Sequence, residues 1–199
     1  MGEKSLNNRL ERDFCYAAAP QNPSSRRYKY KKERWHMSTQ LSYDDLKQEI
    51  IQALQKNIIG TLATSDGNFV TARQVMIISE GLTIFCFTGS ETRKFKQISA
   101  NNNVALAINN IQIDGVATLK GHTSNPKNKG FLIAFEKISS EGYNFWRDKC
   151  LDPKTTLQLI KISPKRIAAY IPKPQAVYLD VLNVDKKTAI RYLMGEEYE

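Results

Sequence analysis

The chain has 199 residues and a net charge of +9, with 41% hydrophobic and 25% charged residues, and this length suits one domain with a core. It contains no apolar run near the roughly 20 residues of a membrane-spanning helix and no apolar N-terminal segment typical of a signal peptide. Three scattered cysteines and two histidines offer little to a metal site or a disulfide framework. We therefore expect a soluble, cytoplasmic protein without a metal site.

The positive charge is concentrated at the N-terminus. Residues 1–36 contain nine Lys/Arg and four Asp/Glu, whereas residues 37–199 contain 20 and 16. The first segment mixes prolines, serines and like charges without an apolar period, so we expect a basic, flexible extension before a domain at 37–199. The two alternatives for this segment are an ordered element that packs on the domain and an arm that binds nucleic acid through YKYKK. The nearly balanced charge of the domain argues against a nucleic-acid-binding fold.

The first predicted element of the domain is an amphipathic helix. Ser42 is a candidate N-cap with Asp45 three residues later, ahead of apolar residues spaced by four. Strands are predicted next at 58–64, 69–78 and 82–88, separated by tight turns that contain Gly67 and Gly81.

The second half of the chain continues with the same kind of short elements. The expected order is a helix at about 92–100, strands at 104–110 and 114–124, a helical region at 125–149, strands at 157–163, 166–171 and 176–181, and a short C-terminal helix. Short strands joined by tight turns favour an α+β fold that is mostly β, an antiparallel barrel or curled sheet with flanking helices, over a doubly wound α/β fold.

The stretch TGSETRKFKQI (88–98) places hydroxyls, a glycine and two cations where a strand gives way to a helix. Thr88 and Ser90 offer hydroxyl groups, the glycine exposes backbone N–H groups, and the helix N-terminus favours an anion. Arg93 can grip phosphate oxygens with two N–H groups, and Lys94 adds a point charge. The pattern indicates a phosphate site, with a solvated cationic turn as the alternative.

A second cation lies inside an apolar strand. In TARQVMII, Arg73 shares a strand face with Val75 and Ile77. Because an unpaired buried charge is costly, we expect an anionic partner for Arg73. This partner is either a ligand or a local carboxylate such as Asp66 or Glu80.

Taken together, these motifs resemble the pyridoxamine 5′-phosphate oxidase superfamily of FMN-binding split barrels. The resemblance rests on RQVMI (73–77), Phe87-Thr88, Arg93-Lys94 and QISANNNVAL (97–106). It extends over roughly residues 42–172, and DPKTTLQLIKISPKRIAAY (152–170) is similar to the general stress protein 26 subfamily.

The resemblance implies an FMN site. Arg73, Arg93 and Lys94 would hold the FMN phosphate with the hydroxyl of Thr88, and the backbone of 74–78 would run past the isoalloxazine edge. The full set of expected cofactor-binding residues is Arg73, Gln74, Val75, Met76, Ile77, Phe87, Thr88, Arg93 and Lys94. The resemblance also implies a homodimer with the cofactor at the subunit interface and a small-molecule substrate.

One departure from the family narrows the expected function. The oxidases carry a lysine where this chain has Ile78, so we do not expect oxidation of pyridoxine phosphate. The leading hypothesis is an oxidoreductase that transfers electrons between a reduced nicotinamide or flavin and a small acceptor, with no catalytic residue assigned. Deazaflavin in place of FMN, a non-enzymatic stress protein that holds flavin or haem, and nucleic-acid association through the basic arm are the alternatives.

Three further residues have two interpretations each, and a fourth, Cys86, has one. His122 could donate a proton to reduced flavin or product, but a structural role is preferred. Trp146 and Tyr143 could cover the flavin, but core packing is preferred, and Cys86 is expected to be a buried small hydrophobe.

Overall fold

The structure is a computed structural model that describes residues 38–173 and 176–194. The predicted extension at 1–36 lies outside the described residues. Within the described part, no helix has the length and apolar character needed to cross a bilayer.

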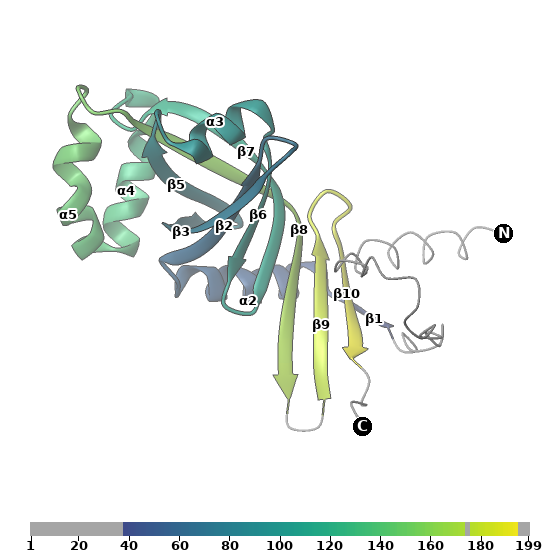
Figure 1. Ribbon diagram of the computed structural model, residues 1–199. Helices are drawn as coiled ribbons and strands as arrows, with labels where there is room; N and C mark the ends of the chain where they lie inside the picture. The colour runs from purple at the N-terminus through teal and green to yellow at the C-terminus, as the bar shows by residue number, and fades with distance from the viewer. Residues whose placement is uncertain (1–37, 174–175, 195–199) are drawn as a thin grey trace. The chain divides into compact units, whose positions relative to one another are not determined.

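Ten antiparallel strands and four α-helices make up the described domain (Figure 1). The strands are β1 (Ser38–Leu41), β2 (Ile59–Ser65), β3 (Val70–Met76), β4 (Ile78–Glu80), β5 (Thr83–Gly89), β6 (Asn103–Ile108), β7 (Ile111–His122), β8 (Leu157–Lys173), β9 (Ala176–Asn183) and β10 (Thr188–Met194). The helices are α2 (Tyr43–Gln55), α3 (Arg93–Ala100), α4 (Lys129–Ile138) and α5 (Ser140–Leu151), with a 3-10 turn at Pro126–Asn128.

The strands form one curled sheet in the order β1-β10-β9-β8-β7-β6-β2-β3, and β5 joins it through β8 and β4. The long strand β8 is shared by two groups of strands. Its first half pairs with β5 and β7, and its second half pairs with β7 and β9. A bulge separates the halves, where Gly115 lies opposite Pro164. A side chain at Gly115 would come within 2.8 Å of the Ser163 carbonyl oxygen, so the bend requires glycine.

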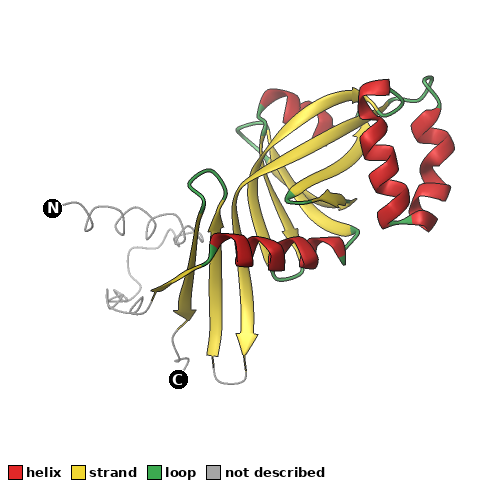
Figure 2. Ribbon diagram, turned by 180° about the vertical axis from the view of Figure 1, so that it is seen from behind, coloured by secondary structure: helices red, strands yellow, loops and turns green. Residues whose placement is uncertain are grey.

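The predicted fold class is confirmed, and most predicted elements are present within a few residues. Helix α2 begins after Ser42, whose Oγ accepts a hydrogen bond from the Asp45 N–H at 3.3 Å. The apolar residues spaced by four, Leu46, Ile50 and Leu54, are at most 3% exposed. Figure 2 shows α2 crossing the face of the sheet that they cover.

Three sequence-based expectations were wrong in detail. The helical region at 125–149 is two helices, because the backbone leaves the helical conformation at Ser139 and begins again at Ser140. The strands expected at 157–163 and 166–171 are the single strand β8, since Pro164 lies at the bulge, where a missing ladder hydrogen bond is tolerated.

The expected C-terminal helix is strand β10 instead, which pairs with β9 and with the unforeseen strand β1. The chain reverses into β10 through a turn in which Lys187 has a φ of 51°. Cross-strand hydrogen bonds and the burial of Ala189 against α2 and the sheet outweigh local helix propensity here.

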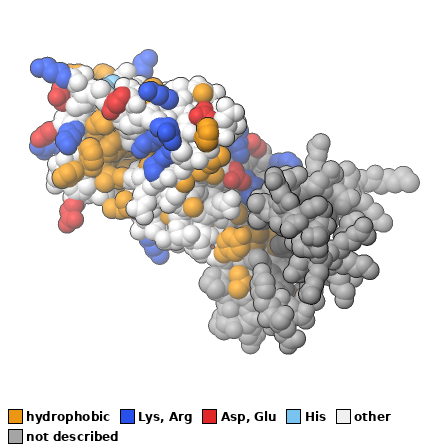
Figure 3. All heavy atoms as spheres, in the orientation of Figure 1, with side chains coloured by type: hydrophobic (Ala, Val, Ile, Leu, Met, Phe, Trp, Pro, Cys, Tyr) orange, Lys and Arg blue, Asp and Glu red, His pale blue; other side chains and the backbone are white. Residues whose placement is uncertain are grey.

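The described residues form three apolar clusters, the smallest of which contains Ala168, Leu179 and Val181. The main cluster lies between the sheet and α2 and includes Cys86, which is 1% exposed. This burial confirms the expectation of a small buried hydrophobe, and it raises the pKa of the Cys86 thiol to about 12. The second cluster is aromatic and joins β5 to α4 and α5. Figure 3 shows hydrophobic side chains at the α4–α5 end of the molecule, where Phe145 is 72% exposed.

Candidate functional site

Strand β5 delivers the chain directly to the N-terminus of α3. Thr92 is the N-cap of α3, and its Oγ1 accepts the Phe95 N–H at 3.4 Å and donates to the Gly89 carbonyl at 2.9 Å. The Thr88 hydroxyl lies 2.9 Å from the same Thr92 oxygen. These contacts fix Arg93, the first residue of the helix, close to the end of β5.

Arg73 lies in the middle of β3 on the inner face of the sheet, where it is half-buried. Its Nη1 donates to the Leu62 carbonyl at 3.3 Å and to Thr64 Oγ1 at 2.6 Å. Its Nη2 donates to Thr71 Oγ1 and, at 3.5 Å, to Gln97 Oε1. All four acceptors are neutral.

No carboxylate of the described residues forms an ion pair with Arg73. The alternative partners weighed from the sequence, Asp66 and Glu80, are therefore not the partners of Arg73. Asp66 instead accepts the N–H groups of Asn68 and Phe69, each at 3.0 Å, in the β2–β3 turn. Arg73 keeps its full positive charge.

Arg73 lies close enough to Arg93 and to Lys94 for their positive charges to repel its own. Burial lowers the pKa of Arg73, and the charge of Arg93 lowers it further. Burial likewise lowers the pKa of Lys94. Cys86 opposes this shift, and the charge of Arg73 lowers the pKa by a smaller amount. In the described part of the chain, the side chains of Arg93 and Lys94 make no hydrogen bond or ion pair. We call Arg73, Arg93 and Lys94 the cation cluster.

The acidic residue of the β5–α3 turn does not neutralise this cluster. The pKa of Glu91 is lowered first by its own backbone N–H and then by the Thr156 side chain, and Lys96 is the cation that contributes. Concentrated positive charge beside a helix N-terminus is the arrangement of an anion site.

Comparison with known proteins identifies the fold that carries the cation cluster. No family model matches the chain. General stress protein 26 of Bacillus subtilis (strain 168) is 31% identical over 68 residues, which are 34% of this chain. The matched part is 49% of that protein, so the chain spans about half the length of this curated relative.

Solved structures extend the similarity to most of the domain. A protein related to general stress protein 26 from Clostridium acetobutylicum has a TM-score of 0.52 at 12% identity, covering 72% of this chain and 98% of that one. A pyridoxamine 5′-phosphate oxidase-related, FMN binding protein from Nostoc punctiforme has a TM-score of 0.51 at 14% identity, covering 74% and 96%. This chain has the pyridoxamine 5′-phosphate oxidase-like split-barrel fold. The resemblance inferred from the sequence motifs is confirmed.

The split barrel divides the nine predicted cofactor-binding residues into groups. It brings Arg73, Thr88, Arg93 and Lys94 together around the start of α3. The side chains of the other five residues lie in other parts of the domain. Val75 and Ile77 belong to the main core, Met76 and Phe87 to the aromatic cluster, and Gln74 is exposed on the outer face of β3.

A shallow pocket of about 360 Å³ lies on that outer face. It is lined by Gln74 together with Lys56, Asn57, Ile58, Ile59, Gly60, Thr61, Ala107 and Asn109. A neighbouring pocket of about 270 Å³ lies between the end of α2 and the β6–β7 turn. Neither pocket includes a member of the cation cluster.

Three other residues have structural roles. His122 Nδ1 lies 2.8 Å from Ser124 Oγ and its Nε2 lies 2.9 Å from the Thr155 carbonyl oxygen, which ties the end of β7 to the segment before β8. The rings of Trp146 and Phe87 are 5.2 Å apart, and those of Tyr143 and Phe135 are 5.6 Å apart. These contacts favour the structural interpretation of His122 and core packing for Trp146 and Tyr143.

Sequence reasoning missed the groups that hold Arg73. Gln97 lies one helical turn after Arg93, and Thr64 and Thr71 face each other across the β2–β3 hairpin. Thr71 precedes Arg73 by two residues, which put both on one strand face. The signal that could have revealed these groups is the Thr-x-Arg pattern, which puts two polar residues on a strand face that is otherwise apolar.

Proposed function

We propose that this protein is an FMN-binding flavoprotein, an oxidoreductase that transfers electrons between a reduced nicotinamide or flavin and a small acceptor. The observation that carries the proposal is the cation cluster beside the N-terminus of α3, without a protein carboxylate paired to it in the described residues. A phosphate monoester is doubly charged near neutral pH and suits such a site.

The donors around the cluster have distinct roles toward a phosphate. Arg93 is exposed and can turn its planar guanidinium toward two phosphate oxygens. Lys94, half-buried, supplies a point charge, and Arg73 supplies a fixed charge with its Nε–H. The first N–H groups of α3 add the helix dipole. The fold shared with the FMN binding protein of Nostoc punctiforme supports FMN as the ligand.

Strand β3 offers backbone groups for the flavin ring. It ends the main path of the sheet and pairs there with β2 alone. Because the Ile77 N–H donates to the Ile58 carbonyl at 2.8 Å, strand alternation directs the N–H and C=O groups of Gln74 and Met76 away from β2. FMN supplies hydride or electron transfer when bound, and such hydrogen bonds to its ring influence its potential.

We further propose that a second copy of the chain completes the site. The outer face of β2, β3 and β6 exposes mainly apolar or small side chains, namely Ile59, Thr61, Val70, Ala72 and Ala107. Val70 is 72% exposed and Ile59 is 47% exposed. A self-complementary sheet face of this kind suits a two-fold dimer, and it includes the pocket beside Gln74.

The first test is FMN titration of the purified protein by absorbance and fluorescence. One FMN per subunit is the expected result, followed by turnover with NADH or NADPH and a quinone or nitro acceptor. The variant Arg93→Ala with Lys94→Ala loses two charge-assisted contacts worth about 1.5–3 kcal/mol each, so its affinity should fall by roughly two orders of magnitude or more.

The matched control is Lys96→Ala with Lys137→Ala, which removes the same charge from exposed helix positions. It should bind FMN as the wild type does. Undiminished FMN binding by the Arg93/Lys94 variant would contradict the phosphate assignment. Binding of haem or a deazaflavin instead of FMN would show that FMN is not the cofactor of this protein.

The dimer has its own test. Ala72→Arg places a long side chain in the middle of the outer face and should convert a dimer to a monomer in sedimentation velocity, with loss of FMN affinity. Thr118→Arg, at an exposed position of β7, should leave both unchanged. A wild-type protein that sediments as a monomer with FMN bound would refute the shared site.

A further inference from the structure

We propose that Gln97 is a positioning residue that holds Arg73 in the cation cluster and, as a neutral acceptor, leaves its charge available to a bound anion. The inference rests on the proposed function, in which that anion is the FMN phosphate. Gln97 reaches Arg73 both directly and through the hydroxyl groups of Thr64 and Thr71.

The geometry of Gln97 is that of a buried junction. Its side chain is 2% exposed although it belongs to a short surface helix. Its Oε1 lies 2.7 Å from Thr64 Oγ1, 2.7 Å from Thr71 Oγ1 and 3.5 Å from Arg73 Nη2. Its Nε2 donates to the Phe69 carbonyl at 3.1 Å. The side chain therefore joins α3 to both strands of the β2–β3 hairpin.

Arginine fixes the direction of the hydrogen bonds that lead from Arg73 to Gln97. A guanidinium can only donate, so Thr64 and Thr71 accept from Arg73. Each threonine hydroxyl then donates its own hydrogen to Gln97 Oε1. The amide nitrogen of Gln97 donates in turn to the Phe69 carbonyl, and this sets the orientation of the amide.

This network explains why the residue is glutamine and not glutamate. A carboxylate at position 97 would accept from the same two threonines with nearly the same shape. It would also place a full negative charge about where Oε1 lies, 3.5 Å from Arg73. The cation cluster would lose about one of its three charges to an internal ion pair, and the amide donor to Phe69 would be lost.

A merely structural Gln97 makes a different prediction from a positioning one. If it only joined α3 to the hairpin, its replacement would weaken every ligand of the site and the fold alike. If it maintains the charge of Arg73, its replacement acts on the phosphate part of a ligand. Riboflavin has the ring of FMN without the phosphate, so comparing the two ligands separates these roles.

The decisive experiment compares FMN and riboflavin binding by wild type and Gln97→Glu in the full chain. We expect the FMN affinity to fall roughly 10- to 100-fold, the range of one charge-assisted contact, and the riboflavin affinity to change less than about twofold. Ser99→Glu is the matched control, because it adds the same charge at an exposed position of α3. Solvent screening should limit its effect on FMN to about threefold or less.

A second pair of variants keeps the test independent of how well Gln97→Glu folds. Thr71→Val removes one bridging hydroxyl and should weaken FMN more than riboflavin, whereas Thr71→Ser retains the hydroxyl and should restore the wild-type ratio. Equal weakening of FMN and riboflavin by Gln97→Glu, or no weakening of FMN, would overturn the inference.

Thermal stabilisation by inorganic pyrophosphate distinguishes this inference from the proposed function. If the wild type binds no FMN but is stabilised by pyrophosphate, and Gln97→Glu is not, the flavin function fails and the positioning role stands. If the wild type and Gln97→Glu bind FMN equally, the positioning role fails and the flavin function stands.

Discussion

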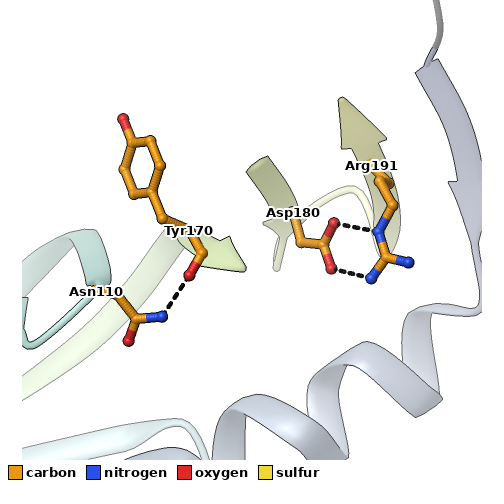
Figure 4. Close-up of polar contacts among 4 residues, drawn as sticks. All are labelled: Asn110, Tyr170, Asp180 and Arg191. Atoms are coloured by element: carbon orange, nitrogen blue, oxygen red, sulfur yellow. Dashed lines mark hydrogen bonds and ion pairs between the residues drawn. The ribbon is translucent and has the colours of Figure 1, made fainter. Parts of the chain in front are cut away.

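Two arginines on the same sheet show how charge balance separates a structural side chain from one that awaits a ligand. Arg191, on β10, donates from Nε and Nη2 to the two oxygens of Asp180 at 2.7 and 2.6 Å (Figure 4). Asp180 is fully buried, and this hydrogen bond raises the pKa of Arg191. Arg73, on β3, is bonded to neutral oxygens, and burial lowers its pKa.

The difference lies in what each arginine would leave behind if it were removed. Arg191 neutralises a buried carboxylate, so the folded domain needs it. Arg73 is itself a half-buried charge without an anionic partner, and its burial lowers the stability of the folded domain. A bound anion would offset this loss. Strand position and partial burial are alike for the two residues, and only their partners differ.

The largest effect is expected from removing the structural arginine. Arg191→Met leaves Asp180 buried without a partner and should lower the free energy of unfolding by about 3–5 kcal/mol. Urea denaturation measures the change. The matched variant Lys165→Met breaks an exposed pair with Asp185, whose side chain is 62% exposed, and should change the stability by less than about 1 kcal/mol. Equal effects would show that Asp180 relaxes into solvent.

The second-largest effect is expected on FMN binding, with little change in stability. Arg73→Met should weaken FMN by roughly 10-fold or more through the loss of one charged partner, while the free energy of unfolding stays within about 1–2 kcal/mol of wild type. Titration and urea denaturation of the same samples give both numbers. A loss of stability as large as that of Arg191→Met would mean that Arg73 is structural too.

The smallest effect concerns Lys94 and its dependence on pH. The pKa of Lys94 is lower in the folded chain than the usual 10.5, so the folded state holds this proton less tightly than the unfolded state. Its destabilising contribution is fully present at neutral pH and disappears as pH rises through the lowered pKa toward 10.5.

Lys94→Met should therefore raise the melting temperature of the cofactor-free protein at pH 7 by about 1–3 °C. The gain should shrink as the pH rises toward 10.5, and the FMN affinity should fall. Differential scanning calorimetry at pH 7 and at higher pH checks this. Lys96→Met, exposed on the same helix, should show no such pH-dependent gain. A melting temperature of Lys94→Met below wild type at pH 7 would contradict the uncompensated charge.

Local patterns in the sequence determined a large part of this protein. The N-cap at Ser42, the apolar spacing of α2, the hairpin turns and the helix start after Thr92 all involve residues within a few positions of one another. Such interactions act before the chain is folded, so their residue patterns predict structure directly. The candidate anion site at Arg93 and Lys94 was visible for the same reason.

Only the tertiary structure decided which groups surround Arg73 and how the second half of the chain pairs. Gln97 is 24 residues from Arg73 in sequence, and Asp180 is 11 residues from Arg191. β8 and β10 are strands because β7, β9 and β1 satisfy their backbone groups. Propensity and periodicity describe one segment at a time, whereas hydrogen bonds and charges are balanced across segments that meet only after folding.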